Sequence, residues 1–142
     1  IGDLQRLPKY NYDALMKTIE ATKDNKRMTL TLCLSYSGRW EITNAVKQIA
    51  EKIKSGELSV EQINEDCVSK YLNTSGMPDP ELLIRTSGEE RISNFLLWQL
   101  AYAELYFTDC LWPEFTDEEF YRAIVDYQRR ERRFGKTSEQ VR

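Results

Sequence analysis

Two runs rich in apolar and β-branched residues constrain the fold more than any other feature of the sequence. They are "MTLTLCLSYS", residues 28–37, and "ELLIRTSG", residues 81–88. Runs this apolar are typical of strands that are covered on both faces, as in a parallel sheet. Each run reaches a Ser-Gly pair, which predicts a turn at its end. We therefore expect an α/β fold built on a parallel sheet.

Amphipathic patterns between and around these runs predict helices. Residues 42–53 carry apolar side chains at three- and four-residue spacing, and Gly56 follows as a helix-end signal. Other helices are predicted over residues 10–26, after a Ser59–Gln62 capping box, over residues 94–104, and from a Thr116–Glu119 capping box to "RRERRFG". "LYFTD" is a candidate third strand. This order requires crossover helices between parallel strands.

Size and charge limit the classes of protein to consider. With 142 residues and 41% hydrophobic content, the chain has the length of one domain. A net charge of -3 and a pI near 5.2 argue against a broad nucleic-acid-binding surface, which would need a basic face. Any site for an anion must therefore be built from a local cluster of basic residues.

The cysteines and the chain start bear on location and completeness. Cys33, Cys67 and Cys110 are odd in number and widely spaced, which favours reduced thiols in a cytoplasmic protein over a disulfide framework or a zinc site. No apolar run approaches the roughly 18 residues that span a bilayer, and no leader pattern is present. The sequence starts at Ile1, and "IGD" resembles the end of a strand, so we expect a longer protein.

The stretch "RTSGEERISN" is the strongest candidate for a binding site. Arg85 ends a predicted strand, Gly88 marks the turn, and Arg91 and Ser93 precede the predicted helix over 94–104. Guanidinium groups bind phosphate bidentately, and a helix start adds free N–H groups. The alternative is that Ser93 only caps the helix while Arg91 pairs with a neighbouring glutamate. The residues alone leave both interpretations open.

Two further features have both a functional and a structural interpretation. Glu104 lies among apolar neighbours, so its carboxylate needs a divalent metal, a hydrogen-bond donor or an arginine partner. Four arginines within "RRERR" suit the last turn of a helix, with Gly135 as its C-cap, yet exceed what a helix dipole requires. Arg39, after "SYSG", is expected to pack at a turn.

Together these segments resemble a known family. "LLIRTSGEERISNFLLWQLAYAELYFTDCLWPEF", with "SYSGRWEI" before it and "RRERRFG" after it, is similar to the undecaprenyl diphosphate synthases, the bacterial cis-prenyltransferases. The resemblance implies a three-layer α/β fold with helices on both faces of a parallel sheet. It makes residues 1–142 the later part of a single cis-prenyltransferase domain, partial because the N-terminal segment is missing.

The resemblance also implies an activity. The complete protein is expected to be a transferase that uses Mg²⁺ to add isopentenyl diphosphate units to farnesyl diphosphate with cis geometry, giving undecaprenyl diphosphate for peptidoglycan biosynthesis. It is expected to be a cytoplasmic homodimer that binds no nucleic acid and contacts the membrane surface transiently when product is released. Trans-prenyltransferases instead use aspartate-rich metal motifs, and the sequence has none.

Site residues follow from the resemblance by position. Arg85, Arg91, Ile92 and Ser93 match positions that bind isopentenyl diphosphate, and Glu104 matches a magnesium ligand. Arg133 and Gly135 match the terminal Arg-x-Gly motif, which helps to complete a substrate site that is often the neighbouring subunit's.

The sequence departs from the family pattern at several points. Ser35 and Ser37 replace residues of an Asn-Tyr-Gly-Gly-Arg motif, so no substrate contact is expected there. Glu90 stands where His or Gln is common and either adds a metal ligand or faces solvent. The catalytic aspartate of the family belongs before Ile1, so residues 1–142 alone are expected to be inactive.

Two other classes of protein fit parts of the sequence. One is a non-catalytic partner subunit of a heteromeric cis-prenyltransferase, which would keep the fold and the terminal Arg-x-Gly. The other is a general phosphate-binding α/β module. The intact "RTSGEERIS" stretch favours the enzyme, since a non-catalytic partner has little need of a phosphate site.

Overall fold

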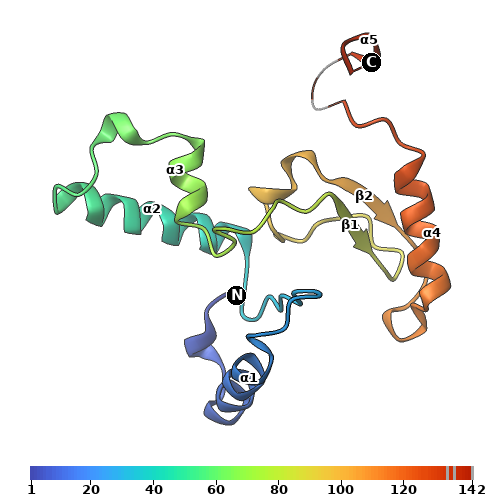
Figure 1. Ribbon diagram of the computed structural model, residues 1–142, viewed down its shortest axis with the longest axis horizontal. Helices are drawn as coiled ribbons and strands as arrows, with labels where there is room; N and C mark the ends of the chain where they lie inside the picture. The colour runs from blue at the N-terminus through green and yellow to red at the C-terminus, as the bar shows by residue number, and fades with distance from the viewer. Residues whose placement is uncertain (134, 136, 142) are drawn as a thin grey trace. The chain divides into compact units, whose positions relative to one another are not determined.

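The computed structural model describes residues 1–133, 135 and 137–141, which divide into two compact units. The N-terminal unit is Ile1–Met77 and the C-terminal unit is Pro78–Arg142. Their elements are labelled in Figure 1. That both units belong to one domain stays a prediction.

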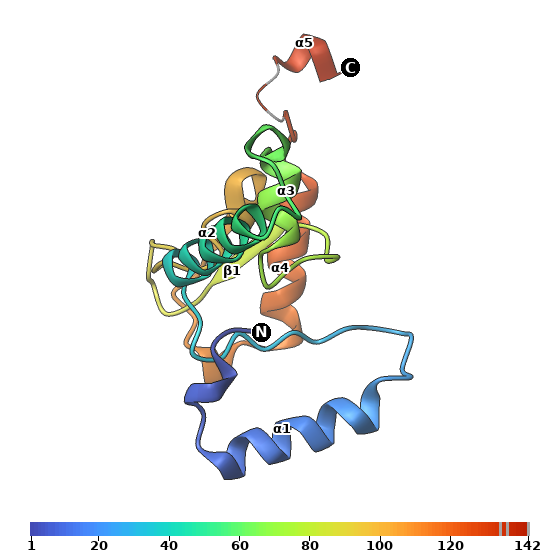
Figure 2. The ribbon, with the colours of Figure 1, turned by 90° about the vertical axis from the view of Figure 1, so that its left-hand side faces the viewer.

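The N-terminal unit is helical. It contains the 3-10 helix η1 (Leu4–Arg6) and the helix α1 (Lys9–Thr22), then α2 (Gly38–Lys54), the 3-10 helix η2 (Val60–Gln62) and α3 (Glu65–Lys70). Figures 1 and 2 both show α2 and α3 side by side, and Ala45, Ile49 and Cys67 are buried there. The predicted helix over 42–53 is confirmed. Ser59 N–H donates to Gln62 Oε1 at 2.8 Å, as the predicted capping box requires. This capping box begins η2 and not α3.

A buried carboxylate connects the start of α2 with distant parts of the unit. The side chain of Glu41, in the first turn of α2, is only 1% exposed. One oxygen accepts from Tyr36 Oη at 2.5 Å and the other from the Asn73 N–H at 2.8 Å. The Asn73 Oδ1 in turn accepts from Gly2 N–H at 3.1 Å. Glu41 thereby joins three separate segments of the unit.

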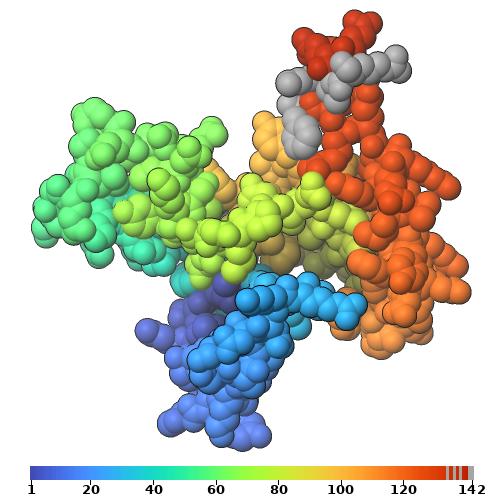
Figure 3. Space-filling view, in the orientation of Figure 1, coloured from blue at the N-terminus to red at the C-terminus, as the bar shows by residue number. Residues whose placement is uncertain are grey.

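The prediction of a buried strand over residues 28–37 is wrong for this structure. The segment belongs to no sheet, and Met28 and Leu30 are largely exposed. It pairs only near its end, where Leu34 N–H donates to Ile1 O at 2.9 Å and the Ile1 amino group donates to Leu32 O at 2.8 Å. Figure 3 shows the segment in light blue on the surface. An apolar β-branched run favours a strand, but a strand forms only where a neighbouring chain segment pairs with its backbone.

The C-terminal unit contains the parallel sheet that the sequence predicts. Its strands are β1 (Leu82–Arg85) and β2 (Glu104–Phe107), paired in parallel so that Leu82 lies opposite Glu104 and Arg85 opposite Phe107. The remaining elements are the 3-10 helices η3 (Gln99–Tyr102) and η4 (Trp112–Glu114) and the helices α4 (Asp117–Gln128) and α5 (Ser138–Val141). Helix α4 lies beside β2 (Figure 1). The α/β class with a parallel sheet is confirmed.

The predicted helix over residues 94–104 is wrong. Ser93, Asn94 and Leu96 have φ angles of 49°, 62° and 44°, which an α-helix cannot contain, and the segment forms turns followed by η3. Glu104 consequently opens a strand instead of ending a helix. Across the described residues, no helix is long and apolar enough to cross a membrane.

The helix predicted from the Thr116–Glu119 box exists as α4, with a correction at each end. Thr116 is its N-cap residue but makes no side-chain capping hydrogen bond. The helix ends at Gln128 with Arg129 as its C-cap, so Gly135 does not cap it. The residues of "RRERR" therefore lie mostly beyond the helix, where they cannot serve its dipole.

The Glu41 linkage yields a stability prediction. Glu41→Ala in the full-length protein should lower the free energy of unfolding by about 1–3 kcal/mol, because the half-buried Asn73 N–H and Tyr36 hydroxyl lose their acceptor. Glu51→Ala, at an exposed position of the same helix, is the matched control. Urea unfolding of both variants measures the difference, and equal midpoints would show that Glu41 does not hold the segments together.

Candidate functional site

Backbone hydrogen bonds join the loops that follow β1 and β2. Thr108 N–H donates to Arg85 O at 3.0 Å, Gly88 N–H to Thr108 O at 3.0 Å, and Ser87 N–H to Cys110 O at 2.9 Å. The turn after β1 is therefore fixed against the turn after β2, with Arg85 at its base. Ligands of parallel α/β sheets collect at this carboxyl edge.

The close approach of the two loops depends on Gly88. Its φ is +65°, and a Cβ at this position would lie 2.9 Å from Asp109 Oδ1. A side chain there would both strain the backbone and push Asp109 away. This is the physical reason for a glycine in the middle of "RTSGEE".

A pocket of about 530 Å³ opens beside this edge of the sheet. Arg85 and the hydroxyl-bearing Thr86 and Ser87 form part of its lining, and the rest is Ile84, Trp112, Phe115 and Phe120. The rings of Trp112 and Phe115 stack with centroids 6.1 Å apart. One guanidinium beside aromatic surface suits a ligand that has an anionic end and an apolar end.

Arg91 and Ser93, the other residues predicted to bind phosphate, are more exposed than Arg85. Arg91 forms an ion pair with Glu89, which is the structural alternative that the sequence left open. Ser93 is exposed and lies in a left-handed turn, so no helix start supports an anion there. Among the described residues, no hydrogen bond or ion pair connects Arg85 with Arg91 or Ser93.

Ile92 and Glu90, the neighbours of these residues, contribute little to a phosphate site. Ile92 is half-buried, and its carbonyl accepts from Phe95 N–H at 2.9 Å, so this residue shapes the turn through its backbone. Glu90 is exposed. In the part of the chain that the structure describes, no three acidic, histidine or cysteine residues group in a way that could hold a metal ion.

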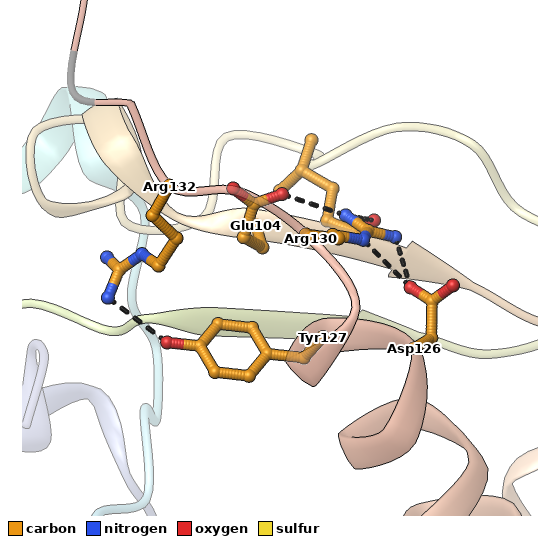
Figure 4. Close-up of polar contacts among 6 residues, drawn as sticks. Glu104, Asp126, Tyr127, Arg130 and Arg132 are labelled. Atoms are coloured by element: carbon orange, nitrogen blue, oxygen red, sulfur yellow. Dashed lines mark hydrogen bonds and ion pairs between the residues drawn. The ribbon is translucent and has the colours of Figure 1, made fainter. Parts of the chain in front are cut away.

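Glu104 is held by an arginine that the sequence-based reasoning did not single out. Its Oε2 accepts from Arg130 Nη1 at 3.0 Å, and Arg130 also donates to Leu105 O at 2.9 Å and to Asp126 Oδ2 (Figure 4). The hydrogen bond to Glu104 and the bonds to Asp126 raise the pKa of Arg130, while partial burial acts in the opposite direction. Glu104 thus has the arginine partner named as one of its alternatives. Its Oε1 has no partner among the described residues.

The strand register separates the two candidate groups. Arg85 ends β1 opposite Phe107, whereas Glu104 begins β2 opposite Leu82. A strand rises about 3.3 Å per residue, so the backbones of these positions lie about 10 Å apart along the sheet. Within this unit, Arg85 and Glu104 therefore lie at opposite ends of the sheet.

The tail after α4 follows the edge that carries Glu104. Arg132 Nη1 donates to Glu81 Oε1 at 2.5 Å and to Tyr127 Oη at 3.1 Å. Arg133 is exposed and pairs with Glu131, and a Cβ on Gly135 would meet no atom within 4 Å. Sequence reasoning saw too many arginines here but did not assign Arg130 and Arg132 to carboxylates. No local sequence pattern distinguishes these two arginines from their neighbours in "RRERR".

The family whose model matches residues 1–135 is described as putative undecaprenyl diphosphate synthase. An isoprenyl transferase of Porphyromonas gingivalis is 54% identical over 141 residues, covering 99% of this chain and 56% of that protein. One from Chlorobaculum tepidum is 54% identical over 142 residues, covering 100% of this chain and 54% of that protein. The chain thus spans about half the length of these relatives.

Solved structures agree with this match. A lavandulyl diphosphate synthase from Lavandula x intermedia, in complex with dimethylallyl diphosphate, has a TM-score of 0.92 and 40% identity, covering 96% of this chain and 58% of the other. A probable undecaprenyl diphosphate synthase from Campylobacter jejuni has a TM-score of 0.81 and 38% identity, covering 96% and 61%. The α/β fold with a parallel sheet is shared with both.

The loop geometry predicts a specific cost for replacing Gly88. Gly88→Ala should destabilise the full-length protein by more than the roughly 1–2 kcal/mol of a left-handed alanine, because its Cβ also meets Asp109. Gly56→Ala is the control, since its φ of +77° is similar and no atom lies within 4 Å. Thermal unfolding compares the two. A smaller loss at Gly88 than at Gly56 would contradict the importance of the contact with Asp109.

Proposed function

The chain belongs to the undecaprenyl diphosphate synthase family, and on this premise we propose that the full-length protein is a cis-prenyltransferase. Its substrates are isopentenyl diphosphate and farnesyl diphosphate, and its product is long-chain undecaprenyl diphosphate, the precursor of the cell-wall lipid carrier. The observation that carries this proposal is the family match over residues 1–135, which includes every site residue named from the sequence.

The proposed reaction joins two diphosphates. A bond forms between C1 of the allylic substrate and C4 of isopentenyl diphosphate, pyrophosphate leaves C1, and a proton leaves C2 of the isopentenyl unit. No nucleophilic side chain takes part in this scheme. What the protein must supply is orientation of the two substrates and stabilisation of the charge on the leaving group.

We assign orientation of isopentenyl diphosphate to Arg85, Arg91 and Ser93. Arg85 is the fixed member, because the joined loops after β1 and β2 hold its backbone. Arg91 is 64% exposed, and among the described residues its ion pair is with Glu89 alone, so a diphosphate can replace the glutamate at little cost. The aromatic side of the Arg85 pocket supports a ligand whose anionic group is attached to a hydrocarbon.

For Mg²⁺ we propose Glu104 as one ligand and Glu90 as a further candidate. The free Oε1 of Glu104 is a hard oxygen donor of the kind that Mg²⁺ prefers, while Arg130 holds the other oxygen. Since one carboxylate is not a complete site, the remaining ligands must come from diphosphate oxygens, water and other residues. Bound Mg²⁺ would neutralise diphosphate charge and favour departure of pyrophosphate.

A homodimer is the assembly that we propose. Glu104 and Arg85 lie at opposite ends of the sheet within one chain, so a second copy offers a way for both kinds of residue to serve one reaction. We place Arg133 and Gly135 in a substrate site of the neighbouring subunit. The proposed compartment is the cytoplasm, with transient contact to the membrane surface during release of the lipid product.

Arg91 provides a test of substrate assignment. In the full-length protein, Arg91→Ala should raise the KM for isopentenyl diphosphate by about tenfold or more, the size expected for a lost charge-assisted hydrogen bond, and change the KM for farnesyl diphosphate far less. Arg122→Ala is the control, since Arg122 is an equally exposed arginine that pairs with glutamates of its own helix. An unchanged KM for isopentenyl diphosphate would show that Arg91 does not bind this substrate.

Glu104 provides a test of the metal assignment. Glu104→Gln keeps the shape but lowers the charge, so the Mg²⁺ concentration for half-maximal activity should rise by about tenfold or more. Binding of Mg²⁺ measured by calorimetry in the presence of isopentenyl diphosphate should weaken in parallel. Glu118→Gln, at an exposed position on α4, is the control. Identical titrations for Glu104→Gln and the unaltered protein would leave Glu104 with a structural role only.

A further inference from the structure

The tail after α4 alternates between half-buried and exposed arginines. Arg130 and Arg132 are half-buried, whereas Arg129, Glu131 and Arg133 are exposed. Arg129 and Arg130 still belong to the turn that ends α4, since their N–H groups donate to Asp126 O and Tyr127 O at 3.1 Å, and residues 131–133 follow without helix or strand. The half-buried arginines of segment 129–133 face the unit, and its exposed residues face solvent.

Both inward arginines bind the starts of the strands. Arg130 bonds to Glu104, the first residue of β2, and to the carbonyl of Leu105. Arg132 bonds to Glu81, which directly precedes β1. It also donates to the Tyr127 hydroxyl (Figure 4), and its guanidinium lies 5.8 Å from the centre of the Tyr127 ring. The two carboxylate residues are themselves adjacent, since Glu104 N–H donates to Glu81 O at 2.9 Å.

These contacts attach the tail, residues 129–133, to the unit at two points. We call them anchors: the first is Arg130 and the second is Arg132. Arg130 is further fixed by Asp126 on the last turns of α4, so the first anchor connects helix, strand and tail. The second anchor lies two residues later, and Arg133 follows it immediately on the exposed side. The side chain of Arg133 is 56% exposed, compared with 23% for Arg132.

We propose that Arg130 and Arg132 are positioning residues that hold segment 129–133 against the starts of the two strands and thereby project Arg133 outward to bind a substrate diphosphate. This inference rests on the proposed role of Arg133 in substrate binding. Arg130 and Arg132 do not touch the substrate in this scheme. They determine where the guanidinium of Arg133 is presented, which reduces the entropy lost when it binds.

The test uses the Arg132–Glu81 anchor, because this pair leaves Glu104 untouched. Arg132→Met in the full-length protein should accelerate hydrogen exchange of the amides of residues 131–133 by about tenfold, as expected for a locally opened segment, without changing exchange in β1 and β2. The KM for isopentenyl diphosphate should rise while kcat changes little. The exchanged pair Glu81→Arg with Arg132→Glu should recover part of both effects. Arg129→Met, an exposed arginine of the same tail, should show neither.

The outcomes separate this inference from the proposed function. If Arg133→Ala raises the isopentenyl KM but Arg132→Met does not, the positioning role is wrong while the assignment of Arg133 stands. If Arg132→Met leaves exchange in residues 131–133 unchanged, no anchor exists and the inference is also wrong. If Arg133→Ala itself leaves the KM unchanged, the substrate role of Arg133 fails, and the positioning role fails with it.

Discussion

The parallel pairing of β1 with β2 determines where every candidate residue of the C-terminal unit lies. Its register fixes Arg85 at one end of the sheet and Glu104 at the other, and the two ends make different interactions. At the carboxyl end, three backbone hydrogen bonds join the following loops around Gly88. At the amino end, Glu81 and Glu104 attract the arginines of the tail. A shift of one residue would move each of these side chains to the other face of the sheet.

Local sequence patterns predicted the elements whose shape depends on local interactions. The helix α2 was read correctly because the period of its apolar stripe specifies the buried face, and β1 was read correctly because a short apolar run precedes a turn signal. The run over residues 94–104 was read as a helix because it is apolar on all sides, which periodicity cannot resolve. Left-handed backbone at Ser93, Asn94 and Leu96 decides against a helix. Such angles are uncommon for these residue types and have no reliable local signal.

The candidate site was predictable in its composition and less so in its connections. Arg85 lies at a strand end, as its place before a turn indicated. Glu104 received the arginine partner that burial of a carboxylate requires, but the sequence could not identify Arg130 as that partner. The contact between Arg132 and Glu81 spans 51 residues of chain. Pairings of this kind follow from the strand register and the end of α4, which no local pattern specifies.

Residues 28–34 expose apolar side chains and backbone groups to solvent. Met28 and Leu30 are 78% and 76% exposed, and residues 28–31 make no backbone hydrogen bond to any residue that the structure describes. A β-prone stretch with open backbone groups and apolar side chains is a template on which a strand from another molecule can add. Residues 28–31 are therefore an open edge at which a strand of another molecule can pair.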